Sequence, residues 1–495
     1  MSAKPKWTPE DRRFFESVGR VIFMNPFDDA RENLLFRVAP GHAGEAFKLD
    51  PKFYAFVAEV EQRIAKLEAQ GLGTIDKFDA EERLFMEPVF LYQVYHRFVA
   101  DLDRLVRRQL ELGDSPAPAP FAGALLAALG ARGFTEERGR HYLAMFYRLR
   151  RAFFFTLSAL VGDSRSMQAL RCALWNAMFT HDMHTYDMYL WNRMEDFSTL
   201  LFGETGTGKG QAASVIGRSG LIPFDAATGR FAWSFSKAYH AINLSQFPEG
   251  LIESELFGHR KGAFTGAISD HAGVFELCAE HGSLFLDEIG EVSVPTQIKL
   301  LQVLQDRTFT PLGSHEKKRF AGRVIGATNR PLTALRESGS FRDDFYYRLC
   351  SDVIVVPPLR ERLEESPGEL EQLVASLVER TTGQKSATLT ATILEAFGRD
   401  LPKGYRWPGN VRELEQAVRR VLLTGSYRGD LAEERASGDD SLAQDVQAGA
   451  LDAPALLSRY CGMLYRRVGT YEEVARRTGL DRRTVRKYIT EDGAA

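Results

Sequence analysis

The sequence is poor in cysteine and lacks any long apolar run. Its 495 residues include 4 cysteines, far apart and without a C-x-x-C spacing. This usage suits a reducing compartment and argues against both a zinc site and a disulfide framework. No stretch reaches the roughly 18 uninterrupted apolar residues of a membrane helix, and the N-terminus lacks the apolar segment of a signal peptide. We expect a cytoplasmic protein without a membrane partner.

The sequence also lacks a large excess of either positive or negative charge. The 63 Lys+Arg and 66 Asp+Glu leave a net charge of −3, and 44% of the residues are hydrophobic. These values exclude a mostly disordered chain, and they require any nucleic-acid surface to be local. At roughly 100 to 200 residues per domain, the length predicts about three domains.

Residues 1–160 have a helical pattern. Apolar side chains recur at three- and four-residue steps between Phe53 and Leu67 and between Phe90 and Leu105, which indicates amphipathic helices. The aromatic stripes are typical of packed core, and the region contains no motif with chemistry. We expect a mostly α-helical regulatory or sensory domain, and we hypothesise that it restrains the activity of the following domain until a signal arrives.

An α/β pattern begins near Gly203. Short apolar runs at 200–202, 283–287 and 323–329 are each followed by a Gly-, Pro- or Asp-marked break and a helical pattern. Alternation of this kind predicts a parallel sheet covered by helices.

A glycine-rich segment follows the first of these runs. Backbone N–H groups in such a loop can surround phosphates, and a lysine can reach the outer ones. Position 210 is Gly, where the general motif has Ser or Thr, and a plain glycine-rich turn is the alternative. The segment comprises Gly203, Glu204, Thr205, Gly206, Thr207, Gly208, Lys209 and Gly210.

Two adjacent carboxylates follow the second apolar run. Asp287 is placed to hold Mg²⁺, and Glu288 to polarise an attacking water molecule. A strand that ends in a solvated acidic turn is the alternative, but the phosphate loop upstream favours a nucleotide site.

The segment 255–267, ELFGHRKGAFTGA, looks like part of the AAA+ domain of bacterial enhancer-binding proteins, the activators of sigma-54-dependent transcription. The other motifs occur in the family's order: GETGTGKG, LFLDEIGE, GATNR, FRDDFYYRL, PPLRER and WPGNVREL. The resemblance runs from about Val161 to Thr424. It implies an α/β ATPase subdomain at 161–360, which carries the sigma-54-interaction loop, and a helical lid at 361–424.

The resemblance also implies roles for individual residues, with ATP and Mg²⁺ as cofactors. The loop glycines and Lys209 would bind the phosphates, Asp287 the Mg²⁺ and Glu288 the water. Asn243 matches the asparagine that restrains this glutamate, and Asn329, or Thr328 beside it, matches the first sensor. Arg412 matches the second sensor, and Arg342 and Arg348 match the arginine fingers that reach into a neighbouring subunit.

Fingers that act on a neighbour imply a ring, which in this family is a hexamer assembled from dimers. The GAFTGA loop would contact the sigma-54 RNA polymerase holoenzyme, with Phe264 as an apolar anchor and Thr265 as a hydrogen-bonding group. The alternative is that Phe264 packs into its own domain. The loop comprises Gly262, Ala263, Phe264, Thr265, Gly266 and Ala267.

The sequence departs from the family pattern at two places. Gly210 stands where the family usually has Glu. The stretch between Met167 and Gly203 is longer than expected and contains His181, His184 and Asp187. A metal site there is one reading, and an aromatic-rich helix or hinge is the one we favour.

The C-terminal part reads as a linker at 425–450 and a helix-turn-helix domain at 451–495. Ala475, Gly479 and Val485 have the spacing of two helices joined by a tight turn, and Asp481 is a candidate N-cap for the second. Basic residues on that helix would contact DNA, and a merely solvated basic helix is the alternative. The candidates are Arg482, Arg483, Thr484, Arg486 and Lys487.

The sequence therefore predicts an AAA+ α/β core with a helical lid, preceded by a mostly α-helical domain and followed by an all-α helix-turn-helix domain. By resemblance it is a bacterial, nucleoid-associated ATPase that binds enhancer DNA, forms a ring and remodels the sigma-54 closed promoter complex. The alternative is a nucleotide-switched DNA-binding repressor or scaffold without remodelling activity.

Overall fold

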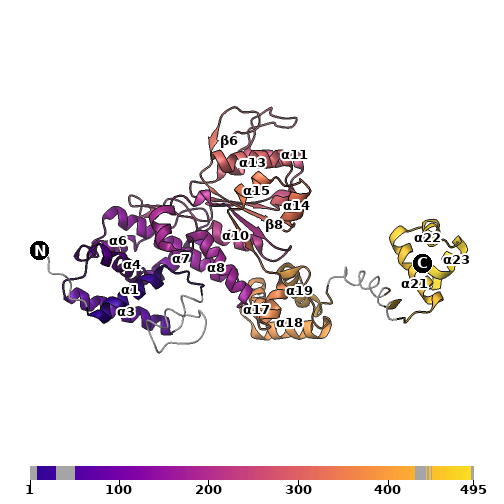
Figure 1. The fold of residues 1–495 in the computed structure, drawn as a ribbon, viewed down its shortest axis with the longest axis horizontal. Coiled ribbons are helices and arrows are strands. Elements are labelled where there is room, and N and C mark those ends of the chain that lie inside the picture. Colours follow the sequence, from indigo (N-terminus) through magenta and orange to yellow (C-terminus); the bar gives the residue numbers. More distant parts are fainter. Residues whose placement is uncertain (1–7, 29–50, 430–441, 443–444, 447–448, 492–495) are drawn as a thin grey trace. The chain divides into compact units, whose positions relative to one another are not determined.

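A computed structural model describes residues 8–28, 51–429, 442, 445–446 and 449–491. The chain divides into two compact units (Figure 1): the first comprises 1–385 and 406–415, and the second 386–405 and 416–495. Most of the predicted linker at 425–450 lies outside the described residues. Among the helices that are described, none is long and apolar enough to cross a membrane.

A five-stranded parallel sheet forms the centre of the first unit. Its strand order is β4-β5-β8-β1-β9. Because the strands are parallel, each is joined to the next by a crossover connection, as in a helix-covered α/β sheet. The inner strands are apolar because helices cover both faces. The strands are β1 (Thr199–Phe202), β4 (Tyr239–Asn243), β5 (Ser283–Asp287), β8 (Arg323–Thr328) and β9 (Asp352–Val355), and two small hairpins pair β2 (Phe224–Asp225) with β3 (Arg230–Phe231) and β6 (Thr308–Phe309) with β7 (Lys318–Arg319).

Side chains that alternate along each strand divide between two cores. Leu200 and Val324 pack on one face with helices α11 to α15, whereas Leu201 and Ile325 pack on the other with α8 and α10. The helices around the sheet are α8 (Arg165–Phe179), α10 (Lys209–Gly217), α11 (Glu249–Phe257), α12 (Val274–Leu277), α13 (Val294–Asp306), α14 (Leu332–Glu337) and α15 (Asp343–Leu349). Single turns lie at η3 (Met194–Asp196), η4 (Leu244–Gln246) and η5 (Ile289–Glu291).

The N-terminal region is helical, which confirms the prediction, and its core continues into the core of the sheet. Phe15, Phe90 and Leu143 belong to the same hydrophobic cluster as Leu201 and Ile325. In Figure 1, α7 lies between the other N-terminal helices and α10. These helices are α1 (Pro9–Phe23), α3 (Pro51–Ala69), η1 (Ile75–Lys77), α4 (Ala80–Arg97), α5 (Val99–Leu112), α6 (Ala122–Ala131) and α7 (Glu136–Ala159).

A buried ion pair ties the segment after α7 to the helices that follow the sheet. The carboxylate of Glu369 pairs with Arg362 and accepts hydrogen bonds from the backbone N–H groups of Asp163 (3.0 Å) and Ser164 (2.8 Å). The residues of the expected lid are helical, in α16 (Leu359–Glu365), α17 (Glu369–Thr382), α18 (Ala387–Asp400) and α19 (Asn410–Thr424). The domain boundaries drawn from the sequence stay a prediction.

The C-terminal helices have a small core of their own. Val474, Val485 and Ile489 are buried together with Cys461 and Leu464. Gly479 ends α22 with a φ of 71°, in the left-handed region that glycine adopts without strain, and the turn to α23 follows. The helices are α21 (Ala453–Val468), α22 (Tyr471–Thr478) and α23 (Arg482–Glu491).

Candidate nucleotide site and partner-binding surfaces

The phosphate loop connects β1 to α10. Gly206 has a φ of 81°, and a Cβ atom at this position would overlap the carbonyl oxygen of Gly409. Gly208 has a φ of 105° and is the N-cap of α10. Only glycine fits such conformations without strain, so the loop is shaped by its glycines and opens directly onto a helix N-terminus.

Lys209 is held against the loop that it follows. Its Nζ atom donates to the carbonyl oxygens of Gly203 (2.8 Å) and Glu204 (3.2 Å), and the residue is 7% exposed. Burial lowers the pKa of the ammonium group, while the carboxylates of Glu288 and Asp287 act in the opposite direction. The lysine is therefore positioned by backbone carbonyl oxygens of the loop itself.

Two of the predicted polar residues meet where neighbouring strands end. The side-chain amide of Asn243, at the end of β4, donates to Oδ2 of Asp287, at the end of β5 (3.3 Å). Its carbonyl oxygen accepts from the backbone N–H of Ser245 (3.0 Å). In this arrangement Asn243 contacts Asp287, whereas the family pattern led us to expect a contact with Glu288.

Glu288 has a left-handed backbone conformation, with a φ of 56°. For a residue other than glycine this conformation is uncommon, and it is often found at functional sites. Burial raises the pKa of its carboxyl group, and the nearby Lys209 ammonium partly opposes the shift. A carboxyl with a raised pKa next to a lysine is suited to general-base chemistry.

The sensor candidate Asn329 follows β8, beside the phosphate loop. Its side-chain amide donates to the hydroxyl of Thr205 (2.8 Å). Thr328 is fully buried, and its hydroxyl accepts from the backbone N–H of Arg330 (3.1 Å). Of the two candidates, Asn329 is therefore the one in contact with the loop.

The two arginine-finger candidates bond groups of their own subunit. Arg342 forms an exposed bidentate pair with Asp344, two residues further on (3.0 and 2.7 Å). Arg348 donates twice to the carbonyl oxygen of Leu304 (3.0 and 2.7 Å). The Arg342 guanidinium is thus held by a surface pair, whereas that of Arg348 would have to leave a carbonyl partner to reach a neighbouring subunit.

The second-sensor candidate Arg412 lies in the first turn of α19, and its backbone N–H donates to the carbonyl oxygen of Gly206 (3.3 Å). Sequence reasoning missed two residues beside it. Arg360 pairs with the carboxylate of Glu204, and Asn410 donates to the same carboxylate (3.2 Å) and to the carbonyl oxygen of Thr205 (3.1 Å). Their motifs, PPLRER and GNVREL, were visible, but the motifs do not show which side chains reach the loop.

The replacement at position 210 leaves room for a side chain. A Cβ atom on Gly210 would meet Phe285 at 3.9 Å, an ordinary contact, and no other heavy atom within 4 Å. The glycine therefore removes a side chain without a steric need for its absence.

The long segment before β1 forms α9 (Met183–Thr185) and the π-helical turn η2 (Tyr186–Leu190). Asp182 caps α9, His184 contacts the ring of Phe23, and Asp187 bonds His141 (2.7 Å). Across the described residues, no group of three or more metal-ligating side chains occurs. The segment is therefore helical, and His184 in it contacts an aromatic ring of α1.

The GAFTGA loop has glycines on both sides of its central residues Ala263, Phe264 and Thr265. Gly262 and Gly266 have φ values of 82° and 102°, and neither would bring a Cβ atom near another group. Phe264 is 36% exposed and has its ring 4.9 Å from that of His259, while Ile268 directly after the loop is 82% exposed. The loop therefore presents apolar surface outside the core.

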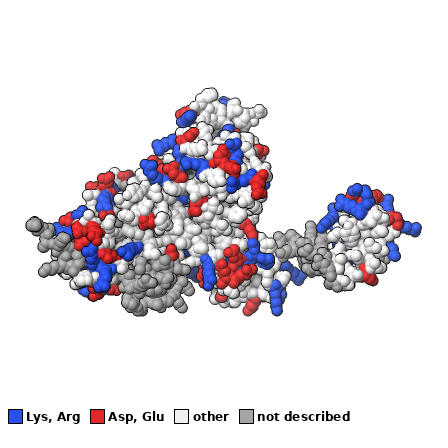
Figure 2. All heavy atoms as spheres, viewed as in Figure 1, with Lys and Arg blue, Asp and Glu red and all other residues white. Residues whose placement is uncertain are grey.

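Basic side chains gather on the C-terminal helices. Figure 2 shows Lys and Arg along one side of this unit, and the five DNA-contact candidates lie on α23 with four of them exposed and Thr484 half-buried. Asp481 caps α23 by accepting from the backbone N–H groups of Arg483 and Thr484, both at 3.0 Å. Arg482 pairs with Glu472 of α22 (2.9 Å), which offsets part of the positive charge.

Comparison with known proteins places this geometry in a family. Residues 183–355 match the model of the Sigma-54 interaction domain. The chain is 37% identical over 338 residues to the transcriptional regulatory protein ZraR of Klebsiella oxytoca, which covers 66% of this chain and 67% of that protein. It is 40% identical over 292 residues to the DNA-binding transcriptional regulator NtrC of Azospirillum brasilense, 58% of this chain and 53% of that protein.

The crystal structure of NtrX from Brucella abortus in complex with ATP covers 76% of this chain and 80% of that one, at 20% identity and a TM-score of 0.42. The chain spans about half the length of several curated relatives that it matches.

The parallel sheet, the phosphate loop and the carboxylates at the end of β5 define an AAA+ core. The match to the interaction domain and the extent of the likeness to ZraR take the assignment further. The chain belongs to the family of sigma-54-dependent transcriptional activators.

Proposed function

We propose that the protein hydrolyses ATP and uses the energy to remodel the sigma-54 RNA polymerase closed complex. The observation that carries this proposal is the convergence of Lys209, Asp287, Glu288 and Asn329 around the phosphate loop. Lys209 binds the outer phosphates, Glu288 accepts a proton from the attacking water, and Asn329 links the end of β8 to Thr205 of the loop.

The residues at the site fit Mg²⁺, which prefers oxygen ligands and keeps several water molecules. The Asp287 carboxylate lies at the end of β5, where Asn243 fixes one of its oxygens. Asp287 would hold the ion, and Mg²⁺ would neutralise charge on the phosphates. Gly210 supplies no ligand at the position where the general motif has a hydroxyl.

Arg342 and Arg348 would complete the site of a neighbouring subunit, so activity requires assembly, from dimers to a hexameric ring. The loop from Gly262 to Ala267 would contact sigma-54 through Phe264 and Thr265, and α23 would hold enhancer DNA. These roles place the protein in the bacterial cytoplasm, at the nucleoid.

The test uses the full chain with ATP, sigma-54 RNA polymerase and a supercoiled promoter carrying a binding site for the protein. Wild-type protein should yield open complexes. Glu288→Gln should bind ATP with near wild-type affinity, because the side chain keeps its shape, but lose turnover because the amide cannot accept the proton. Nucleotide binding without open complexes would leave the alternative, a nucleotide-switched DNA-binding repressor or scaffold, as the function.

Thr265→Ala tests the proposed sigma-54 contact separately from ATP hydrolysis. The hydroxyl lies on an exposed loop, so the variant should keep the ATPase rate and lose open-complex formation. Ser245→Ala is a contrasting variant in η4, where the Ser245 hydroxyl donates to Asn243 (2.7 Å) beside the nucleotide site, and its output should follow its ATPase rate. Full activation by Thr265→Ala would remove that hydroxyl from the proposed contact.

A further inference from the structure

Three arginines are buried together where β8 begins, at the end of the sheet opposite the phosphate loop. Arg148 and Arg151 come from α7, and Arg323 begins β8; their exposed fractions are 3%, 0% and 6%. Within the described part of the chain, none of the three guanidinium groups forms an ion pair with a carboxylate. Buried charges are normally paired, so this cluster requires an explanation.

The arginines bond carbonyl oxygens at the ends of two helices. Arg148 donates to Met178 in the last turn of α8 and to Ser219 just after α10, both at 2.8 Å. Arg151 donates to Arg218 and Gly220 (2.6 Å each), and Arg323 donates to Ala177 (2.8 Å). Helix capping of this kind satisfies part of the donor capacity.

Capping leaves a surplus of positive charge. A helix C-terminus carries about half a negative charge, so α8 and α10 together offset about one of the three positive charges. The carboxylate of Asp352 acts on Arg323, and it is the charged group that raises the pKa of that arginine against burial. Arg148 has no such neighbour, and burial together with Arg323 and Arg151 lowers its pKa.

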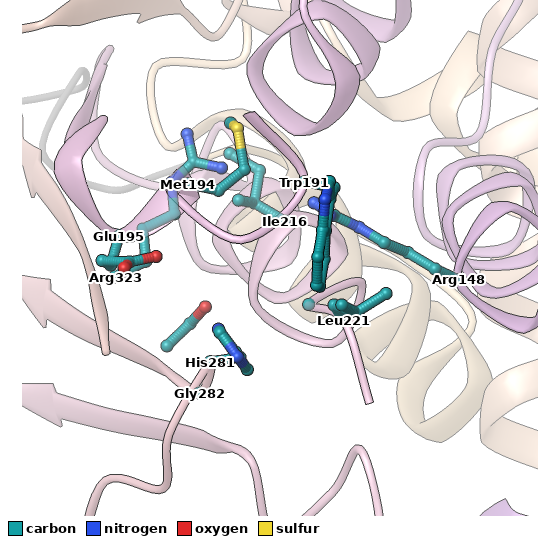
Figure 3. Close-up of a pocket in the computed structure, with 11 residues that line it drawn as sticks. Arg148, Trp191, Met194, Glu195, Ile216, Leu221, His281, Gly282 and Arg323 are labelled. Atoms are coloured by element: carbon teal, nitrogen blue, oxygen red, sulfur yellow. The ribbon is translucent and has the colours of Figure 1, made fainter. Parts of the chain in front are cut away.

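A cavity opens between two of these arginines. It has a volume of about 30 Å³, and its walls include Arg148, Arg323, Trp191, Glu195 and His281. Figure 3 shows Arg148 entering from α7 beside Trp191, with Arg323 and Glu195 on the other side. Among the described contacts, Nη1 of Arg148 has no hydrogen bond, and Nε of Arg323 is buried without a partner.

We propose that this cavity binds a small oxyanion, of the size and charge of inorganic phosphate, through Arg148 and Arg323. The anion supplies the negative charge that the cluster lacks and accepts charge-assisted hydrogen bonds from the guanidinium groups. Because α7, the end of α10 and the starts of β5 and β8 all border the cavity, the bound anion joins the N-terminal helices to the ATPase sheet. This site is separate from the phosphate loop, which lies at the other end of α10.

The experiment titrates the full chain with inorganic phosphate, against potassium chloride at equal ionic strength, and follows thermal unfolding and heat of binding. All variants carry Lys209→Ala, which weakens phosphate binding at the nucleotide loop. Phosphate should raise the unfolding temperature in a saturable manner. Adding Arg148→Gln should weaken binding at least about tenfold, since a hydrogen bond to a charged group contributes that factor.

Arg151→Gln is the matched control, because Arg151 is equally buried on the same helix but does not line the cavity. It should lower the unfolding temperature and leave the phosphate response intact. Glu195→Gln changes a half-buried residue of the cavity wall and should tighten phosphate binding, because it removes the repulsion between two negative charges. If Arg148→Gln does not fold, the phosphate affinity of Glu195→Gln tests the proposal instead. Absence of a saturable response, or a response equally sensitive to Arg151 and indifferent to Glu195, would overturn the proposal.

Discussion

The buried pair between Glu369 and Arg362 allows a quantitative prediction. Their side chains are 0% and 4% exposed, and Glu369 also accepts from the backbone of Asp163 and Ser164. Glu369→Gln keeps the shape but leaves Arg362 without a counter-charge and turns an N–H₂ group toward backbone donors. Breaking one partner of a buried pair costs about 3–5 kcal/mol, and we expect the free energy of unfolding to fall by that amount.

The assay is urea unfolding followed by tryptophan emission. Trp175, Trp191, Trp233 and Trp407 all lie in the first unit, so the signal follows the unit that contains the pair. Glu365→Gln is the control, since Glu365 accepts one exposed bond from Ser166 (2.7 Å) and its loss should change stability by no more than about 0.5 kcal/mol.

A decrease below about 1 kcal/mol for Glu369→Gln would refute the reasoning, because only a solvated pair is worth so little. Arg362→Met combined with Glu369→Gln should recover part of the loss, since the unpaired buried charge is then gone. The free energy of unfolding of the double variant is compared with that of Glu369→Gln alone. If the double variant is the less stable of the two, Arg362 and Glu369 do not interact as described.

Further predictions follow from the nucleotide site. Gly210→Ala should raise the free energy of unfolding by about 0.5–1 kcal/mol in urea, since the helix gains a residue of lower entropy cost and the new Cβ atom has room. Gly206→Ala should reduce nucleotide affinity in a fluorescent ADP titration, and unaltered binding would contradict the overlap with Gly409. The ATPase rate should fall on acidification as Glu288 is protonated; because burial raises its pKa, the midpoint of a kcat profile should lie above the ordinary value of 4.5, and a midpoint at or below it would exclude this base.

The sequence predicted those parts of the fold that depend on local pattern. The runs at 283–287 and 323–329 are strands β5 and β8, because residues buried on both faces must be apolar along their whole length. Gly479 and Asp481 end and begin helices in the C-terminal unit, since a left-handed C-cap and a side-chain N-cap require those residue types.

What the sequence could not predict depends on partners that are distant in the chain. The amide of Asn243 could face either acid of the Asp287-Glu288 pair, and only the placement of β4 beside β5 turns it to Asp287. The inward orientation of Arg348 depends on a carbonyl oxygen of α13, and the contact of Asn410 with the phosphate loop depends on the course of α19. Backbone carbonyl oxygens leave no mark in a sequence pattern.

The packing of α7 on α10 changes how the N-terminal region can be studied. Deletion of residues 1–160 would remove Arg148 and Arg151 from the carbonyl oxygens just after α10, and would expose Val215 and Ile216 to water. At 1.5 Å per residue, the 9 residues of α10 span only about 13 Å, so the newly exposed surface would lie that close to the phosphate loop. Loss of the proposed activity in such a deletion variant would then report damage rather than regulation, so the hypothesis of a regulatory role is better tested by point changes on the outer faces of α1, α3 and α4.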